Sequence, residues 1–403
     1  MSSSTFSPSD NFSPPRENRL YPELFALHKE IHDFSKNLND FLRLLEIQKR
    51  IITSISEAEK EIQSSKKARR DPKDWQYIRY NFLCLGDCLA FLYMDRFALK
   101  QTYFNVETYE PKPSGGFISG KSGYEYEMKC LETVISLNVP AVLCDITNVL
   151  RYGDICLLGG NDPSFIEVKS SNTKDRRGRR QQKKLQTLCD FLISDRAENF
   201  RGHHGVTIRS EISNTPILYA DEMQAAVEEA IKVGSTSFEI DECLKVVVIA
   251  DGNVNSDYGN LFEKRDLSRS LFVFVNEIKT NMSWGSYYPY PLTFSEPTHF
   301  EAFIRGEVHI ITSLNIDAFE KKLAPEHVSL TFEENGCEIQ CHIHFSDFLV
   351  DGEKAHFVIS EHMLCRIWTD FIRPRWVIEN AICLIRNIPD VMLAHPNSDD
   401  QRK

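Results

Sequence analysis

The most informative segment of this chain reads Gly153-Asp154-Ile155-Cys156-Leu157-Leu158-Gly159-Gly160-Asn161-Asp162-Pro163-Ser164-Phe165-Ile166-Glu167-Val168-Lys169. Two apolar-rich runs flank a Gly-Gly-Asn-Asp-Pro group, whose residues suit a positive or a fixed φ angle. The segment therefore predicts a β-hairpin. Counting outward from a turn at 159–162 places Asp154 directly opposite Glu167.

The side chains of this hairpin sort onto two faces, because successive residues of a strand point to opposite sides. Asp154, Glu167 and Lys169 share one face. Two carboxylates side by side repel each other unless a cation lies between them, and hard oxygen ligands suit Mg²⁺. A lysine beside them is placed to orient or deprotonate water, or to stabilise charge on a phosphate. The other face is apolar and predicts a core behind it: Ile155, Leu157, Ile166 and Val168.

The order Asp, hairpin, Glu-x-Lys resembles the signature of the PD-(D/E)xK (restriction-endonuclease-like) superfamily. Where that family usually has proline before the Asp, this chain has Gly153. A helix is predicted from Gly123 onward by its apolar spacing, and Glu127 best matches the family's metal-site Glu at a helix start. Downstream, a basic segment enters a helix bearing Gln182, and the family often has a Gln there. The resemblance covers roughly residues 118 to 215.

The resemblance implies an α/β (α+β) fold with a restriction-endonuclease-like core and a Mg²⁺-dependent nuclease activity, with Mn²⁺ as a substitute for Mg²⁺. Asp154 and Glu167 would hold the metal ion, and Glu127 would complete or orient its shell. Lys169 would position or activate the attacking water, and Gln182 is a weaker candidate for orienting either. DNA is favoured over RNA as the substrate because the family mostly acts on DNA. By analogy, a nuclease with extra helical and sensing regions is similar to prokaryotic effectors of antiviral defence. The alternative without a function is a solvated hairpin with ion pairs.

A cluster of cations follows the hairpin. It begins at Lys174 and places seven basic residues and one acid into eleven positions that enter a helix. Cations at a helix N-terminus oppose the helix dipole, so another interaction must favour them. Phosphate contacts would do so, although a solvated loop is the alternative. The nucleic-acid-binding candidates are Lys174, Arg176, Arg177, Arg179, Arg180, Lys183 and Lys184.

Composition sets wider bounds. The chain has 403 residues, enough for two or three domains, and a formal net charge of −11, which argues against indiscriminate coating of nucleic acid. Its 11 cysteines form no C-x-x-C pair, which fits a reducing cytosol. No signal segment is recognised, and the most apolar run, 82–94, contains Asp87 and is too short to span a bilayer. We expect a cytoplasmic protein without a membrane partner.

The N-terminal region predicts helices. Residues 1–19 are rich in Ser and Pro, and we expect disorder there. From Leu24 to Ile55, apolar residues step by three and four in a heptad seam whose one polar member is Gln48. A second seam runs from Trp75 to Leu92. Two helices packing on each other explain both seams. The alternative is an arm that forms a homo-oligomer.

Two rival functions arise from the sequence. Gly115 to Ser122 satisfies the phosphate-loop pattern G-x-x-x-x-G-K-[ST] with Lys121 as its lysine, which suggests a nucleotide hydrolase. Residues 110–114 do not read as the buried strand that such a loop requires. The nuclease interpretation treats this glycine-rich segment as a flexible lead into the helix of Glu127. The second rival keeps the fold but predicts a nucleic-acid-binding subunit that a partner protein activates.

The region beyond the hairpin predicts mixed helices and strands. Val246 to Ile249 reads as a buried strand, an outlying member of the core sheet, and 267–279 as a helix. Cys337, Cys341, His342 and His344 suggest zinc, but Cys341 and His342 would point to opposite faces of a strand. The expected domains are a tail (1–19), a helical domain (20–110), the nuclease domain (111–215), a mixed C-terminal domain (216–390) and a second tail (391–403).

Overall fold

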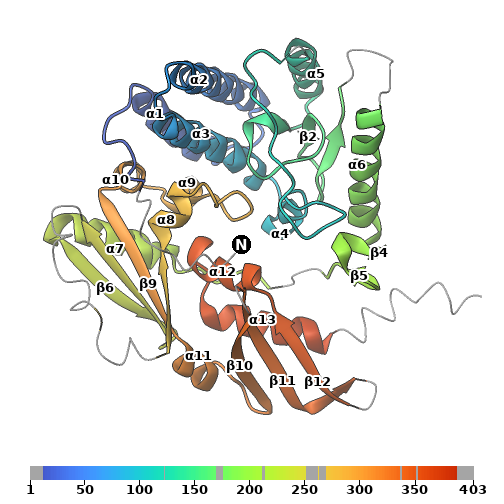
Figure 1. Ribbon diagram of the computed structural model, residues 1–403, viewed down its shortest axis with the longest axis vertical. Coiled ribbons are helices and arrows are strands. Elements are labelled where there is room, and N and C mark those ends of the chain that lie inside the picture. Colours follow the sequence, from blue (N-terminus) through green and yellow to red (C-terminus); the bar gives the residue numbers. More distant parts are fainter. Residues whose placement is uncertain are drawn as a thin grey trace, which may run out of the picture. The chain divides into compact units, whose positions relative to one another are not determined.

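The computed structural model describes residues 12–121, 123–168, 176–210, 214–250, 262, 269–335, 338–350 and 353–387. The described chain is an α+β protein that combines helices with small antiparallel sheets (Figure 1). It forms two compact units. The first contains Pro14–Arg209 and Thr280–Glu301, and the second contains Ser210–Lys279 and Ala302–Lys403. The expected helical and nuclease regions thus share one unit. Residues 1–11 of the first expected tail and all of the second lie outside the described residues, whereas 12–19 are described and Arg19 forms ion pairs with Glu57 and Glu61 of α2.

Three helices pack side by side in the first unit: α1 (Tyr21–Phe34), α2 (Phe41–Lys67) and α3 (Lys73–Phe91). Helix α3 is buried on nearly all sides from Tyr77 to Phe91, as expected for the central helix of a layer. The predicted seam is not one helix, because the chain turns between α1 and α2. There the Asp40 side chain accepts a hydrogen bond from the Arg43 backbone N–H and starts α2.

The predicted seam residues are mostly buried within the first unit itself. Leu24, Leu27, Ile31, Phe34 and Ile55 are all at most 1 % exposed. This burial agrees with helices packing on each other within one chain. It leaves the expected oligomer through these residues without support.

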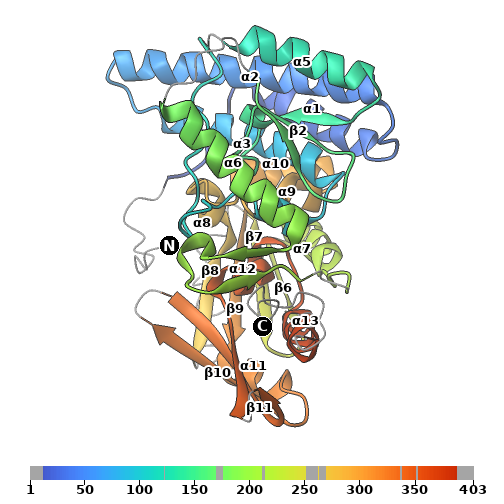
Figure 2. The same ribbon diagram turned by 90° about the vertical axis from the view of Figure 1, so that its right-hand side faces the viewer.

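The predicted hairpin follows helix α5 (Tyr124–Ser136) in a three-stranded antiparallel sheet. The sheet order is β1 (Ala141–Leu143), β2 (Ile155–Leu157) and β3 (Ser164–Ile166), with a short 3₁₀ helix, η2 (Cys144–Ile146), after β1. Ile155 pairs with Ile166 and Leu157 with Ser164, which confirms the predicted register. Figure 2 shows α5 lying along α2.

Gln48 explains why one polar residue stands in the helical seam. Its side chain is fully buried on α2 and faces the backbone of β1. The Gln48 Nε2 donates to the Ala141 carbonyl at 3.0 Å, and the Leu143 N–H donates to Gln48 Oε1 at 3.0 Å. The side chain therefore satisfies both kinds of backbone group on the edge of β1 that β2 leaves open.

A second polar residue, Asp87 on α3, fixes the loop that leads into β2. Its carboxylate accepts hydrogen bonds from the backbone N–H groups of Asn148 and Val149 and from the Asn148 side chain. Burial raises the pKa of Asp87 to about 7, against these hydrogen bonds. One helix thus holds the start of the hairpin in place.

Helix α6 (Arg176–Ser194) follows the hairpin and packs its apolar side inward. Its buried Leu188, Phe191 and Leu192 form a cluster with Tyr152 and Phe200, and Phe165 of β3 packs against this cluster. The remaining elements of the first unit are α4 (Arg96–Lys100), β4 (Arg196–Glu198), η3 (Phe200–Gly202), β5 (Val206–Ile208) and α9 (Tyr290–Thr293).

The second unit contains two antiparallel sheets. The four-stranded sheet has the order β6 (Ser235–Ile240), β7 (Leu244–Ala250), β9 (Val308–Asn315) and β8 (Ser270–Phe274). The three-stranded sheet has the order β10 (Val328–Asn335), β11 (Glu338–Val350) and β12 (Glu353–Ile359). The helices are α7 (Ala220–Val233), α8 (Val275–Thr280), α11 (Ile316–Lys322), α12 (Glu361–Thr369) and α13 (Pro374–Arg386), together with the end of α10 (Pro297–Arg305).

Two sequence expectations are wrong in this unit. The strand at 246–249 belongs to β7 of the four-stranded sheet, not to the sheet that holds the hairpin. The segment expected as a helix at 267–279 is the strand β8 followed by the short helix α8, because Leu271 to Phe274 pair with β9. Among the described helices, none is both long and apolar enough to cross a membrane.

Candidate active site

Three carboxylates gather around one ammonium group in the first unit. The Lys121 Nζ lies 2.8 and 2.9 Å from the two carboxylate oxygens of Glu127 and 2.6 Å from Asp145 Oδ2. Asp154 Oδ1 lies 3.8 Å from the same nitrogen. Two of these acids, Glu127 and Asp154, are predicted metal ligands, so the structure brings them to a common cation.

Each acid reaches the cluster from a different element. Glu127 is in the first turn of α5, Asp145 is in η2, and Asp154 immediately precedes β2. Asp154 is the most firmly held, because its N–H donates to the Ile166 carbonyl at 3.0 Å and its carbonyl accepts from Cys144 at 2.9 Å. Its carboxylate also accepts the Val168 N–H at 2.8 Å. The sheet backbone therefore sets the direction of this side chain.

The backbone conformation of Gly153 explains why glycine, and not proline, precedes Asp154 in this chain. Its φ angle is +65°, a conformation that proline cannot adopt because its ring fixes φ near −65°. A Cβ atom at this position would also lie 2.9 Å from the Cβ of Phe165. Glycine is thus required here by both the backbone turn and the close approach of β3.

The cluster consists of one buried acid, Glu127, and two half-buried acids, Asp145 and Asp154, around one cation. Burial raises the pKa values of Glu127 and Asp154, and the Lys121 ammonium opposes both shifts. Burial also disfavours the charged form of Lys121, but its hydrogen bonds to Asp145 and Glu127 outweigh that effect and raise its pKa. The lysine therefore stays charged at neutral pH and neutralises part of the acid cluster.

The segment before Lys121 is anchored, in contrast to the flexible lead that we expected. Ser119 donates its backbone N–H at 2.9 Å to Glu59, a fully buried acid of α2 that also accepts from Arg79 at 2.8 Å. Lys121 itself donates its backbone N–H to the Ile118 carbonyl. These hydrogen bonds fix the turn to α2, so that the Lys121 side chain points toward Glu127 and Asp145.

The other predicted catalytic residues are Glu167, Lys169 and Gln182. Continuing the β2–β3 register by one residue puts Glu167 opposite Asp154, and Glu167 is half-buried. Its charge favours the ammonium form of the half-buried Lys112, whose pKa is lowered by burial. Lys169 lies outside the described residues. Gln182 is exposed on α6.

No family model, curated protein or solved structure matches this chain in the comparisons made with it. The interpretation of the site therefore depends on the geometry of its own residues. Within the described part of the chain, no three His, Cys, Asp or Glu side chains are spaced as ligands of one metal ion. The donor set is nevertheless of the right type for a hard divalent cation, because it consists of carboxylate oxygens around a point that already holds positive charge.

The predicted cation cluster is only partly described. Arg179, Arg180 and Lys183 are exposed on α6. Lys184 is less available for binding phosphate, because its Nζ forms a 2.6 Å ion pair with Glu107. This contact lowers the pKa of Glu107. Lys174 and the side chains of Arg176 and Arg177 lie outside the described residues.

Sequence reasoning missed two members of the cluster, Asp145 and Lys121. The apolar run at 141–146 is not one strand, because β1 ends at Leu143 and η2 follows. An acid at the end of an apolar strand, just before the hairpin, was the available signal. Lys121 was considered only as the lysine of a phosphate loop.

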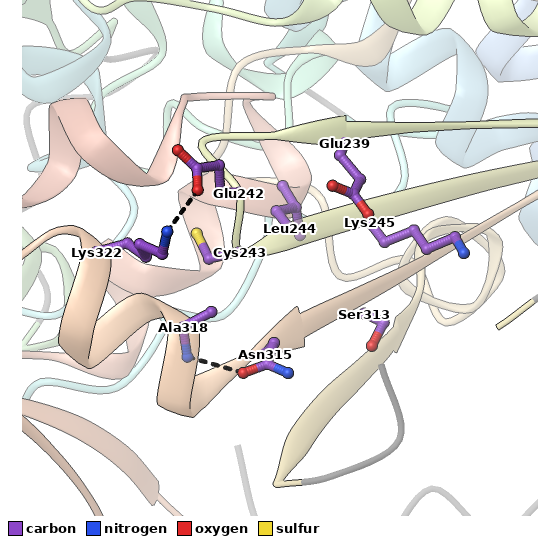
Figure 3. A pocket seen from close by; sticks show the side chains of 9 residues that line it. All are labelled: Glu239, Glu242, Cys243, Leu244, Lys245, Ser313, Asn315, Ala318 and Lys322. Carbon is purple, nitrogen blue, oxygen red and sulfur yellow. Dashed lines mark hydrogen bonds and ion pairs between the residues drawn. The ribbon is translucent and has the colours of Figure 1, made fainter. Parts of the chain in front are cut away.

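The second unit contains a separate pocket of about 270 Å³, shown in Figure 3. It lies between the β6–β7 turn, β9 and α11, and its polar groups bond to one another. Lys322 forms a 2.7 Å ion pair with Glu242, and Asn315 accepts the Ala318 N–H at 2.8 Å to cap α11. Glu242, Lys322 and Asn315 are thus engaged in contacts within the lining of the pocket.

Proposed function

We propose that this chain is a Mg²⁺-dependent nuclease that hydrolyses phosphodiester bonds, with DNA as the favoured substrate. The observation that carries the proposal is that Glu127 on α5 and Asp154 on the hairpin meet at one cation, and that the hairpin has the predicted register. A solvated hairpin with ion pairs would not require acids from three separate elements to converge. Glu127 is buried and Asp154 is half-buried, and burial raises the pKa of both carboxyls, as is common for acids at functional sites.

The order of elements also supports a restriction-endonuclease-like core. Helix α5, strands β1 to β3 and helix α6 follow one another in the chain, and the acids lie at the start of the helix and beside the hairpin. This is the arrangement that the resemblance implied for residues 118–215. The proposed core is therefore α5–β1–β2–β3–α6.

The roles of the residues follow from their positions. Asp154, Glu127 and Glu167 would hold Mg²⁺, with Asp145 as a further carboxylate at the same point. When bound, the ion would supply a Lewis acid for the phosphate. The Val168 N–H, just after β3, holds Asp154 Oδ2, and the other carboxylate oxygen, Oδ1, faces the Lys121 ammonium. Lys121 holds the acids together until a divalent ion replaces its charge.

The hydrolysis itself adds one water molecule across a P–O bond. The water oxygen bonds to phosphorus, the bond to the leaving sugar oxygen breaks, and the water proton passes to a base. In this proposal Lys169 positions or deprotonates that water and stabilises the charge on the phosphate. The exposed cations Arg179, Arg180 and Lys183 would bind the flanking phosphates.

A second candidate is a nucleic-acid-binding subunit that a partner protein activates, in a defence complex. It is favoured by the position of Lys121, because an ammonium among the acids keeps the site from being a ready metal site. This candidate predicts binding with a steep salt dependence and no cleavage by the chain alone. A role in prokaryotic defence is part of both proposals by analogy.

A nucleotide hydrolase is a weaker candidate. The described residues 111–117 form no strand leading into the glycine-rich turn, although such a loop needs one. Lys121, which would reach the phosphates, is held by Glu127 and Asp145. This candidate predicts ATP binding that is lost in Lys121→Ala and retained in Lys169→Ala.

The proposal is tested by a substrate panel of supercoiled plasmid, linear duplex, single-stranded DNA and RNA. The full chain is incubated with Mg²⁺, Mn²⁺ or EDTA, beside Glu167→Gln and Lys169→Met. Cleavage by the wild type with metal, and its loss in both variants, is the expected result. Cleavage that survives both substitutions would refute the site. Salt-sensitive binding without cleavage by the wild type would favour the partner-activated subunit.

A further inference from the structure

Three histidines line one face of the three-stranded sheet in the second unit. His342 and His344 are two residues apart on β11 and therefore project to the same side. His356 on β12 is the register partner of His344 and completes the group. The strands β10, β11 and β12 lie side by side in Figure 1.

The opposite face of this sheet is the buried one. Cys341, Ile343 and Phe345 are at most 2 % exposed there. The cysteine that suggested zinc in the sequence therefore points away from the histidines, as strand alternation predicted. The second cysteine of that interpretation, Cys337, lies outside the described residues. Instead of the two cysteines, His356 of the neighbouring strand β12 lies beside His342 and His344.

The imidazole rings are stacked closely. The rings of His344 and His356 are 4.6 Å apart and 5° from parallel, and those of His342 and His356 are 5.0 Å apart at 11°. The Nδ1 of His342 lies 2.8 Å from the Nε2 of His356. Two imidazole nitrogens bound to one tetrahedral Zn²⁺ at 2.0–2.1 Å lie about 3.3 Å apart. The present 2.8 Å separation is that of a hydrogen bond, so the two rings must move apart by about 0.5 Å to admit an ion.

Further oxygen and nitrogen atoms surround this pair. The Nε2 of His342 is buried without a hydrogen bond, and a carboxylate oxygen of Glu333 on β10 lies 3.5 Å from it. The Nε2 of His344 lies 3.2 Å from the hydroxyl of Thr331. Three imidazoles and a carboxylate are thus grouped on one exposed face, although no three of them yet converge on one point.

We propose that His342, His344 and His356, with Glu333 beside them, form a binding site for a divalent transition-metal ion of the zinc class. Such ions prefer imidazole nitrogens as ligands, whereas Mg²⁺ prefers carboxylate, carbonyl and water oxygens. The ion replaces the proton between His342 and His356, and rotation of the exposed side chains brings the third ligand to it. This site is in the second unit and does not depend on the proposed nuclease function.

The test is a Zn²⁺ titration of the full chain by calorimetry, with millimolar Mg²⁺ present to occupy the carboxylate cluster. The wild type is compared with His356→Gln and with the control His327→Gln, an exposed histidine at the foot of β10 that is outside the group. We expect at least a tenfold loss of affinity in His356→Gln and no change in His327→Gln. Equal affinity in all three proteins, or no binding by the wild type, would overturn the proposal.

A second readout identifies the residues without relying on a variant. Diethylpyrocarbonate acylates neutral imidazoles, and mass spectrometry locates the modified histidines in the wild type. Zn²⁺ is expected to protect His342, His344 and His356 and to leave His327 reactive. Unchanged modification of the three histidines in Zn²⁺ would overturn the proposal even if His356→Gln failed to fold.

Discussion

Replacing Lys121 by methionine removes the ammonium that Glu127, Asp145 and Asp154 share. The side chains of these acids are 5 %, 18 % and 26 % exposed, so water screens their mutual repulsion incompletely. Removing one partner of a fully buried ion pair costs about 3–5 kcal/mol. Because Lys121 is itself 30 % exposed, a loss of about 2–3 kcal/mol in the free energy of unfolding is expected.

A divalent cation is expected to restore part of that loss. A ligand that binds only the folded chain adds about 2.7 kcal/mol when its concentration is a hundred times its Kd. In the variant, Mg²⁺ meets three acids without a competing ammonium, so its stabilising effect is expected to exceed that in the wild type. Lowering the pH from 7.5 to 4.5 in EDTA is also expected to reduce the loss, because protonation of the acids removes their repulsion.

The measurement is urea-dependent hydrogen exchange on peptides from α5 and β1–β3, with EDTA or Mg²⁺. This readout reports on the first unit alone within the full chain. The control is Lys49→Met, which removes a lysine 3.1 Å from Glu132 and 40 % exposed, and which is expected to lose at most about 0.5 kcal/mol. Equal stability of Lys121→Met and wild type in EDTA, or the same Mg²⁺ effect in both, would refute the reasoning.

Three further predictions concern the scaffold and the basic helix. Gln48→Leu leaves two backbone groups of β1 without their partner and is expected to lose about 1–3 kcal/mol in a urea titration. Burial lowers the pKa of His28 from 6.5 to about 4, so the folded chain binds fewer protons than the unfolded chain below pH 6.5. Stability is therefore expected to fall on acidification, by about 2 kcal/mol at pH 5 from this group, and His28→Gln should flatten that dependence in urea titrations at pH 7 and 5. Arg179→Ala and Lys183→Ala are each expected to weaken DNA binding and to reduce the salt slope by about 1 in fluorescence anisotropy, whatever the DNA sequence.

Gln63→Leu, on the exposed side of α2, should leave stability nearly unchanged, and equal losses in both glutamine variants would contradict the role of Gln48. An unchanged pH dependence in His28→Gln would exclude that histidine as its source. Unaltered salt slopes in Arg179→Ala and Lys183→Ala would remove α6 from the proposed nucleic-acid interface.

The hairpin was predictable because its signals are local. Alternating apolar residues and the turn at 159–162 define the register, and the structure has Ile155 opposite Ile166 as counted. The helical seams were also visible, but the three-and-four spacing continues through the turn after Phe34 and conceals that break. Local patterns therefore gave the elements more reliably than their boundaries.

The site was only partly predictable, because its geometry depends on contacts between distant residues. Asp145 becomes a member of the cluster because β1 ends early and η2 turns, so its place at the end of an apolar run was the one local signal. Lys121 meets an acid that is 24 residues away in the chain, and its sequence motif pointed to phosphate instead. His356 likewise joins His342 and His344 only through the pairing of β11 with β12.

The most direct test of the central claim is plasmid cleavage by the wild-type chain beside Asp154→Asn, in Mg²⁺ and in EDTA. Asp190→Asn, an equally conservative change at an exposed acid of α6, serves as the control. The account predicts Mg²⁺-dependent cleavage by the wild type and Asp190→Asn, and a loss of at least a hundredfold in Asp154→Asn, as about 2.7 kcal/mol of lost transition-state stabilisation would give. Cleavage by Asp154→Asn at the wild-type rate would contradict it.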